Sequence, residues 1–132
     1  MSSLSISQLT PYIGAEIGNI DLKSVSSDQI EMIRAALLQH QVVFFRDQDL
    51  SPEEHIAFAR NFGDLEIHPA TPKGQPNPEV LHIAHGPESR GAENAWHSDV
   101  TWREKPSLGP NLKAVEVPEV GVDPLFANLQ LP

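Results

Sequence analysis

The sequence contains no cysteine, which excludes disulfide bonds, thiolate zinc sites and a cysteine nucleophile, and is typical of a reducing compartment. Basic residues are scarce, since nine Lys and Arg stand against 18 Asp and Glu and give a formal charge of −9. Such a charge repels phosphate groups, so we expect neither a nucleic-acid nor a membrane partner. The longest strongly apolar run, 42–45, is too short to cross a bilayer, and no export signal opens the chain. We therefore expect a cytoplasmic protein.

The length of 132 residues predicts one domain, 1–132, with one core and no second domain. Apolar residues alternate with polar ones near 4–6 and 13–17, which predicts two strands. Two helices follow from local signals. Capping boxes begin at Ser26 and at Ser51, and they predict helices over 28–39 and from 52 to about Gly63. In the second helix, Ile56, Ala59 and Phe62 are expected to form the buried edge.

Between and beyond the helices the sequence favours strands and loops. The β-branched and aromatic run 42–45 predicts a buried strand, and 65–78 is rich in proline and glycine, which is typical of a surface loop. Three further segments have the composition of strands, namely 80–85, 112–117 and 125–129. The chain is thus expected to be mixed α+β and mainly β.

One short motif suggests metal chemistry. His97 and Asp99 lie two positions apart between Trp96 and Trp102, and on an extended segment their side chains would point to the same side. Two histidines and a carboxylate on one face of an octahedron form the site of non-haem Fe(II) oxygenases. The pair alone is a weak signal, because six histidines and seven aspartates give about 0.3 such pairs by chance. A surface turn is the alternative.

The other histidines give less specific signals. His82 and His85 are three apart, so on a strand their rings would face opposite sides. His40 and His55 fall on or beside helices and are interpreted as structural. His68, at the start of the proline-rich loop, can donate a hydrogen bond to an anionic substrate or simply be solvated. Two further polar residues, Glu93 and Asn94, could orient a substrate or only solvate a loop.

An ordered series of motifs resembles a known family. The segments are LSI (4–6), PYIGAEI (11–17), HQVVFFRDQ (40–48), FGDL (62–65), IHP (67–69) and WHSDVT (96–101). Together they are similar, in order and spacing, to the N-terminal half of TauD/TfdA dioxygenases, which depend on Fe(II) and 2-oxoglutarate. The resemblance spans nearly the whole chain and is far more specific than any one motif.

The resemblance implies a fold, cofactors and a reaction. The fold would be part of a double-stranded β-helix, or jelly roll, with flanking helices. His97 and Asp99 would hold the iron together with a histidine further downstream, and 2-oxoglutarate would chelate the same ion. The family couples decarboxylation of 2-oxoglutarate to hydroxylation of a substrate. Such chemistry needs open coordination positions and a dry pocket.

The resemblance also implies substrate contacts. His68 matches a histidine that contacts the anionic group of the substrate, and Val100 matches a pocket residue. Thr71, however, stands where members that act on taurine have a tyrosine, and 92–93 reads Ala-Glu where they have Asp-Asn. We therefore expect a small anionic substrate, either a taurine-like sulfonate or a related sulfate ester or carboxylate.

Two departures concern the cofactor and the iron. Pro124 stands where many members have a threonine that bonds 2-oxoglutarate, and proline offers neither a hydroxyl nor a backbone N–H. No histidine follows His97 and no arginine follows Arg103, so the downstream iron ligand and the arginine that binds the cofactor carboxylate are absent from these 132 residues.

Two interpretations remain. In the first, the chain is the truncated N-terminal portion of an oxygenase domain and is inactive alone. In the second, it is a catalytically incomplete module that binds metal weakly or mediates interactions. Unpaired strand edges would then favour self-association into homo-oligomers.

Overall fold

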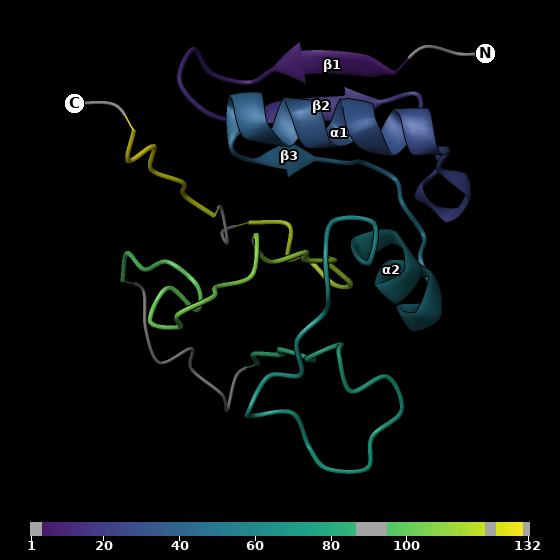
Figure 1. The fold of residues 1–132 in the computed structure, drawn as a ribbon, viewed down its shortest axis with the longest axis vertical. Coiled ribbons are helices and arrows are strands. Elements are labelled where there is room, and N and C mark those ends of the chain that lie inside the picture. The colour runs from purple at the N-terminus through teal and green to yellow at the C-terminus, as the bar shows by residue number, and fades with distance from the viewer. Residues whose placement is uncertain (1–3, 87–94, 121–123, 131–132) are drawn as a thin grey trace.

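All regular elements of the structure lie in its first half. The computed structural model describes residues 4–86, 95–120 and 124–130. The elements, in chain order, are β1 (Ser5–Gln8), β2 (Ala15–Gly18), the 3-10 turn η1 (Leu22–Ser24), α1 (Ser27–His40), β3 (Val43–Phe44) and α2 (Pro52–Ala59). Figure 1 shows α1 running alongside the sheet and α2 set apart from it, while the later residues wind through coil.

The sheet is small and mixed, with the order β1-β2-β3. β1 and β2 form an antiparallel pair in which Ser5 faces Gly18, whereas β2 and β3 are parallel, with Ala15 opposite Val43. Parallel neighbours need a long crossover, and α1 supplies it. Gln41 ends this helix in the left-handed conformation, at φ 66°. The chain can therefore turn at once into β3.

Both helices begin as their sequences predict. Ser26 accepts a hydrogen bond from the backbone of Gln29, Ser51 accepts one from Glu54, and each box is closed by the reciprocal side-chain bond. The prediction for α1 is confirmed to within one residue at each end. α2 ends at Ala59, before the predicted Gly63, because the following N–H groups form tighter bonds to carbonyls three residues back.

Among the described residues, the buried core belongs entirely to positions 4–58. Its buried members are Leu4, Ala15, Ile17, Leu22, Ile33, Ala36, Leu50, Ile56 and Phe58. Phe58 is 4% exposed, and its ring meets those of Phe45 and Phe62 edge to face, with centroids 5.8 Å and 5.4 Å away. The predicted edge of α2 was therefore incomplete: Ile56 is buried, but Phe58 rather than Phe62 is the aromatic residue enclosed by the core.

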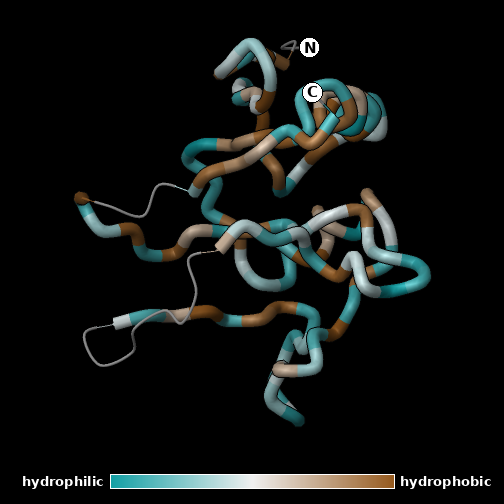
Figure 2. Tube along the Cα trace, turned by 90° about the vertical axis from the view of Figure 1, so that its left-hand side faces the viewer, coloured by the Kyte–Doolittle hydropathy of each residue, from teal (hydrophilic) through white to brown (hydrophobic). Residues whose placement is uncertain are grey.

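The predicted strands at 80–85, 112–117 and 125–129 are wrong, because the structure forms no strand in these segments. Their apolar side chains lie in solvent: Leu112 is 80% exposed, Val115 85% and Leu129 87%. Brown, hydrophobic stretches therefore also occur along the coil in Figure 2. A strand-like composition is realised only against a paired strand and a buried face, and these segments have neither.

The fold class is confirmed only in part. Helices and a sheet occur together, as predicted for an α+β chain, but in the described residues the helices hold more residues than the strands, so "mainly β" is wrong. The described residues contain one three-stranded sheet and not the two facing sheets of a jelly roll. Neither helix in this part of the chain has the length and apolar character to span a bilayer.

Polar contacts attach the coil to the N-terminal core. No described residue after Phe58 is classed as buried, so apolar burial contributes little to holding it. Four contacts join α2 or the residues beside it to the coil, and one joins the β1–β2 turn to it. The pairs are Glu53–Asn77, Arg60–Glu79, His55–Asn111, Leu50–Lys113 and Tyr12–Asn128. We therefore expect the coil to separate from the core more easily than the core unfolds.

The Asn77–Glu53 contact affects the titration of the Glu53 carboxyl. The side-chain amide of Asn77 donates to Glu53 at 2.7 Å and, with the helix N-terminus and Ser51, lowers the pKa of the Glu53 carboxyl. The stability that this contact contributes is present above the ordinary pKa of 4.5 and is lost as pH falls through the lowered value. Asn77 has φ 53°, so glycine is the substitution that keeps its backbone.

In Asn77→Gly we expect the pKa of Glu53 to rise towards its ordinary value, as measured by NMR titration of the side-chain carboxyl. Asn128→Gly, which removes a contact at the other end of the molecule, serves as the control and should leave this pKa unchanged. An unaltered Glu53 titration in Asn77→Gly would contradict the assignment.

Candidate functional site

The segment that carries the predicted metal pair forms a turn rather than a strand. Val100 has φ +47°, a left-handed conformation that costs a β-branched residue on the order of 1–3 kcal/mol. The backbone N–H of Arg103 donates to the Val100 carbonyl at 3.1 Å, and the hydroxyls of Ser98 and Thr101 lie 3.1 Å apart. Strain of this kind persists only where neighbouring contacts impose it. The extended segment expected from the sequence is thus replaced by a turn.

The turn still brings the two candidate ligands together. Nε2 of His97 lies 3.4 Å from Oδ1 of Asp99, and the two side chains are 76% and 50% exposed. Nδ1 of His97 lies 3.0 Å from the carbonyl oxygen of Ala95. A carbonyl can only accept, so Nδ1 carries the proton, and in the neutral ring Nε2 is left with its lone pair. This is the tautomer that a metal-binding histidine adopts.

The distance between the two donor atoms is compatible with a shared metal ion. Adjacent ligands at about 2.1 Å from an octahedral ion lie about 3 Å apart, so a shift of a few tenths of an ångström would suffice. In the neutral ring, Nε2 of His97 and Oδ1 of Asp99 are both electron-pair donors, 3.4 Å apart. A cation bound between them would remove their mutual repulsion. With the ring protonated, the same contact is instead an ordinary exposed ion pair.

The pair supplies two ligands and not a complete set. Within residues 4–86, 95–120 and 124–130, no three His, Asp or Glu side chains are grouped so as to hold a metal ion. His55 donates to Asn111 at 2.8 Å, which agrees with a structural role. His97 and Asp99 therefore fit two of the three protein-ligand positions of a facial iron site.

His68 is held in the opposite tautomer. The backbone N–H of Ala70 donates to Nδ1 of His68 at 3.1 Å, and the N–H of Thr71 donates to the His68 carbonyl at 2.8 Å. A backbone N–H can only donate, so Nδ1 is the acceptor and the proton of the neutral ring sits on Nε2. The exposed ring therefore presents an N–H donor to solvent, as an anion-binding group requires.

Thr71 introduces an unusual polar atom beside this ring. Its hydroxyl oxygen is buried and has no hydrogen-bond partner among the described residues. Buried hydroxyls are normally bonded, so an unpartnered one calls for an explanation. The sequence singled out Thr71 only because it replaces a tyrosine, and composition could not show that its hydroxyl would be buried.

The remaining predicted residues lie apart or outside the described chain. Pro124 is exposed and lines an apolar groove of about 220 Å³ with Phe44 and Phe126. Glu93, Asn94 and 121–123 fall outside the described residues. Among the residues that line the groove, Thr10 has the one polar side chain.

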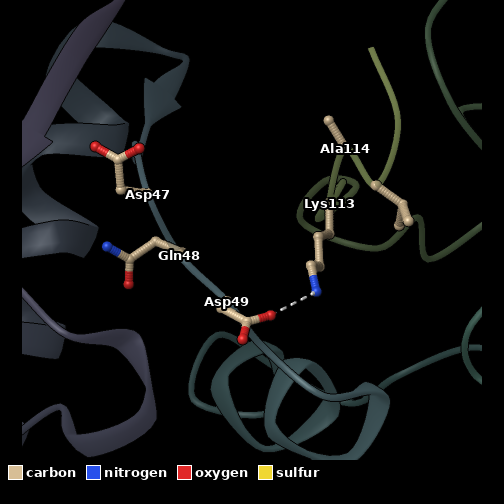
Figure 3. Close-up of a pocket in the computed structure, with 6 residues that line it drawn as sticks. Asp47, Gln48, Asp49, Lys113 and Ala114 are labelled. Atoms are coloured by element: carbon tan, nitrogen blue, oxygen red, sulfur yellow. Dashed lines mark ion pairs between the residues drawn. The ribbon is translucent and has the colours of Figure 1, made fainter.

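A second depression contains none of the predicted site residues. It has a volume of about 410 Å³ and lies between the connection from β3 to α2 and residues 113–115 (Figure 3). Lys113 reaches across it to the carbonyl of Leu50 and lies 3.9 Å from Asp49. The lysine thus connects the coil to the segment that precedes α2, mainly through the Leu50 carbonyl.

The sequence did not indicate one contact near the site. Arg103 pairs with Glu66 at 2.5 Å, which joins the turn of the metal pair to the segment before His68. No local pattern predicts a contact between side chains so far apart in the chain, and neither residue belongs to a motif.

Comparison with known proteins establishes the family. Residues 5–130 match the Taurine catabolism dioxygenase TauD, TfdA family. The chain belongs to this family, and the resemblance found in its sequence motifs is confirmed.

Individual relatives agree with this assignment. An alkylsulfatase of Acinetobacter baylyi is 35% identical over 130 residues, and an alpha-ketoglutarate-dependent sulfate ester dioxygenase of Pseudomonas putida is 33% identical over 127. The aligned regions cover 96% and 95% of this chain but only 40% and 42% of those relatives. The chain therefore spans less than half the length of each of these two relatives.

Solved structures show the same relationship. A taurine dioxygenase from Burkholderia xenovorans superimposes with a TM-score of 0.50 at 40% identity, covering 53% of this chain and 26% of the other. The fold of about half of the chain is thus shared with that enzyme.

Proposed function

We propose that this chain contributes two iron ligands, His97 and Asp99, and an anion-binding histidine, His68, to an Fe(II)- and 2-oxoglutarate-dependent dioxygenase. The observation that carries the proposal is the 3.4 Å approach of Nε2 of His97 to Oδ1 of Asp99, with Nδ1 of the ring already engaged. Family membership supports it. Bound iron and 2-oxoglutarate would supply the oxidising power for hydroxylation of a substrate C–H bond.

The protein groups have distinct tasks in this proposal. The Ala95 carbonyl keeps the proton on Nδ1 of His97, so that Nε2 is free to bind metal. Asp99 supplies negative charge that balances the ion. His68 donates from Nε2 to the anionic group of the substrate, because Ala70 occupies its Nδ1. Val100 directly follows Asp99 in the chain and is proposed to contact the substrate.

A small sulfonate or sulfate ester is the proposed substrate. Two relatives support this choice by their names, the sulfate ester dioxygenase and an alpha-ketoglutarate-dependent sulfonate dioxygenase of Saccharomyces cerevisiae that is 31% identical. Both groups offer several acceptor oxygens to the His68 donor. We further propose that the chain forms the N-terminal portion of a dioxygenase domain and that the third iron ligand lies on another segment.

A second candidate function follows from the incomplete ligand set. Only two metal donors meet within the described residues, so the chain alone would be a weak metal-binding module without oxygenase activity. Its exposed apolar side chains favour self-association, which stays a prediction.

Anaerobic titration of the 132-residue chain with Fe(II) and then 2-oxoglutarate tests the proposal. We expect one Fe(II) to bind saturably, and circular dichroism verifies that the chain is folded. A visible charge-transfer band on addition of 2-oxoglutarate would favour the dioxygenase site, whereas bound iron without the band would favour the weak metal-binding module. A folded chain that binds no Fe(II) would contradict both.

A further inference from the structure

The Arg103–Glu66 ion pair is partly shielded from solvent at both ends. The guanidinium Nη1 lies 2.5 Å from a Glu66 carboxylate oxygen, and the two side chains are 29% and 32% exposed. In the Arg60–Glu79 pair, by contrast, the arginine is 62% exposed. Partial burial weakens screening by water and salt, so the Arg103–Glu66 pair is expected to hold its partners more firmly than an exposed pair.

Arg103 is itself tied to the turn that carries the metal pair. Its backbone N–H donates to the carbonyl of Val100, the residue after Asp99. Its guanidinium lies over the Trp102 ring, 5.0 Å from the centroid. A displacement of the Arg103 guanidinium is therefore expected to displace the turn as well, and Asp99 with it.

Glu66 is tied in the same way to the anion-binding histidine. It precedes His68 by two residues, and the His68 ring and carbonyl are both bonded within the turn that continues to Thr71. The ion pair thus joins two short, internally bonded segments, 66–71 and 97–103, that are distant in the sequence.

We propose that Arg103 and Glu66 are positioning residues, which hold the His97–Asp99 turn against the His68 turn so that metal and substrate anion share one site. The proposal rests on the proposed function for its purpose, although the contact can be tested without metal. Arg103, the last arginine of the chain, is thereby committed to Glu66 and is not free to bind a cofactor carboxylate.

The absence of cysteine allows a direct test on the whole chain. Glu104, exposed and adjacent to Arg103, is replaced by cysteine and labelled with a nitroxide, and amide signals of 66–71 are followed by NMR. We expect the label to broaden these signals in the otherwise native chain. Arg103→Glu should abolish the broadening, and the charge swap Arg103→Glu with Glu66→Arg should restore it.

Arg60→Glu is the matched control, because it reverses a charge in a more exposed pair that joins α2 to the loop before residue 80. It should leave the broadening of 66–71 unchanged. The proposal is overturned if the native chain shows no broadening, if Arg103→Glu keeps it, or if the swap fails to restore it. Arg103→Glu would also lose the broadening if the variant were unfolded. The charge-swap variant is therefore decisive, because only a folded chain with the ion pair restored regains the broadening.

A second readout separates positioning from the proposed function. Mn(II) bound at His97 and Asp99 should broaden the His68 ring signals in the native chain, and Arg103→Glu should remove this effect while Mn(II) still broadens His97. Persistent broadening of His68 in Arg103→Glu would overturn the positioning role. If Mn(II) broadens neither ring, the proposed metal site fails, and the nitroxide result still decides the contact.

Discussion

Replacing His97 by alanine is expected to abolish saturable binding of a divalent metal ion by the chain. The substitution removes one of the two donor atoms that meet at 3.4 Å and leaves a single exposed carboxylate. Loss of a partner outside the ligand shell already costs about 10–100-fold in metal affinity, so loss of a ligand should cost at least about 100-fold. Calorimetric titration with Mn(II), or the Fe(II) titration described above, measures it.

The control for this variant is His55→Ala. His55 is a partly exposed histidine that bonds Asn111 and forms no ion pair with a carboxylate of the described residues. We expect its metal affinity to match that of the native chain. Asp99→Asn should behave like His97→Ala, because the amide keeps the shape and removes the charge. Equal affinity in His97→Ala and the native chain would place metal binding elsewhere.

Replacing Phe58 by alanine is expected to cost about 3–5 kcal/mol of unfolding free energy, the usual range for a buried phenylalanine. Phe58 is 4% exposed, and its ring contacts those of Phe45 and Phe62, so truncation opens a cavity beneath α2. The total free energy of unfolding of a small domain is about 5–15 kcal/mol. The variant should therefore lose a large share of its stability, which urea denaturation followed by circular dichroism would show as a lower transition midpoint.

Phe126→Ala provides the matched comparison. Its ring also meets another aromatic edge to face, with the Phe44 centroid 5.9 Å away, but Phe126 is 46% exposed. Less area returns to water, so we expect a cost below about 1.5 kcal/mol. Similar losses in the two variants would show that the core does not reside in the first 58 residues.

Sequence reasoning succeeded where structure is determined locally. The two capping boxes specify their helices through bonds that span three residues, and the structure has both. The aromatic residue of α2 was assigned less well, because the choice between Phe58 and Phe62 depends on where Phe45 packs. The strand at 112–117 failed for a related reason, since a strand requires a partner that its own sequence does not specify.

Sequence reasoning likewise found some residues of the candidate site and missed others. His97 and Asp99 were found as a motif, although a turn rather than an extended segment brings their donor atoms together. The tautomers of His97 and His68 depend on hydrogen bonds to the carbonyl of Ala95 and from the N–H of Ala70. These bonds are seen only in the three-dimensional structure. Glu66 and Arg103 carry no local signature at all, because their significance arises from a contact between distant segments.

The position of the core in the chain has a consequence for biosynthesis. Every buried apolar residue of the described chain lies between Leu4 and Phe58, and the sheet and both helices are formed by residues before 60. N-terminal segments fold first during translation. The hydrophobic unit can therefore assemble before residues 97–103 have left the ribosome, so that the turn carrying His97 and Asp99 meets a scaffold already in place.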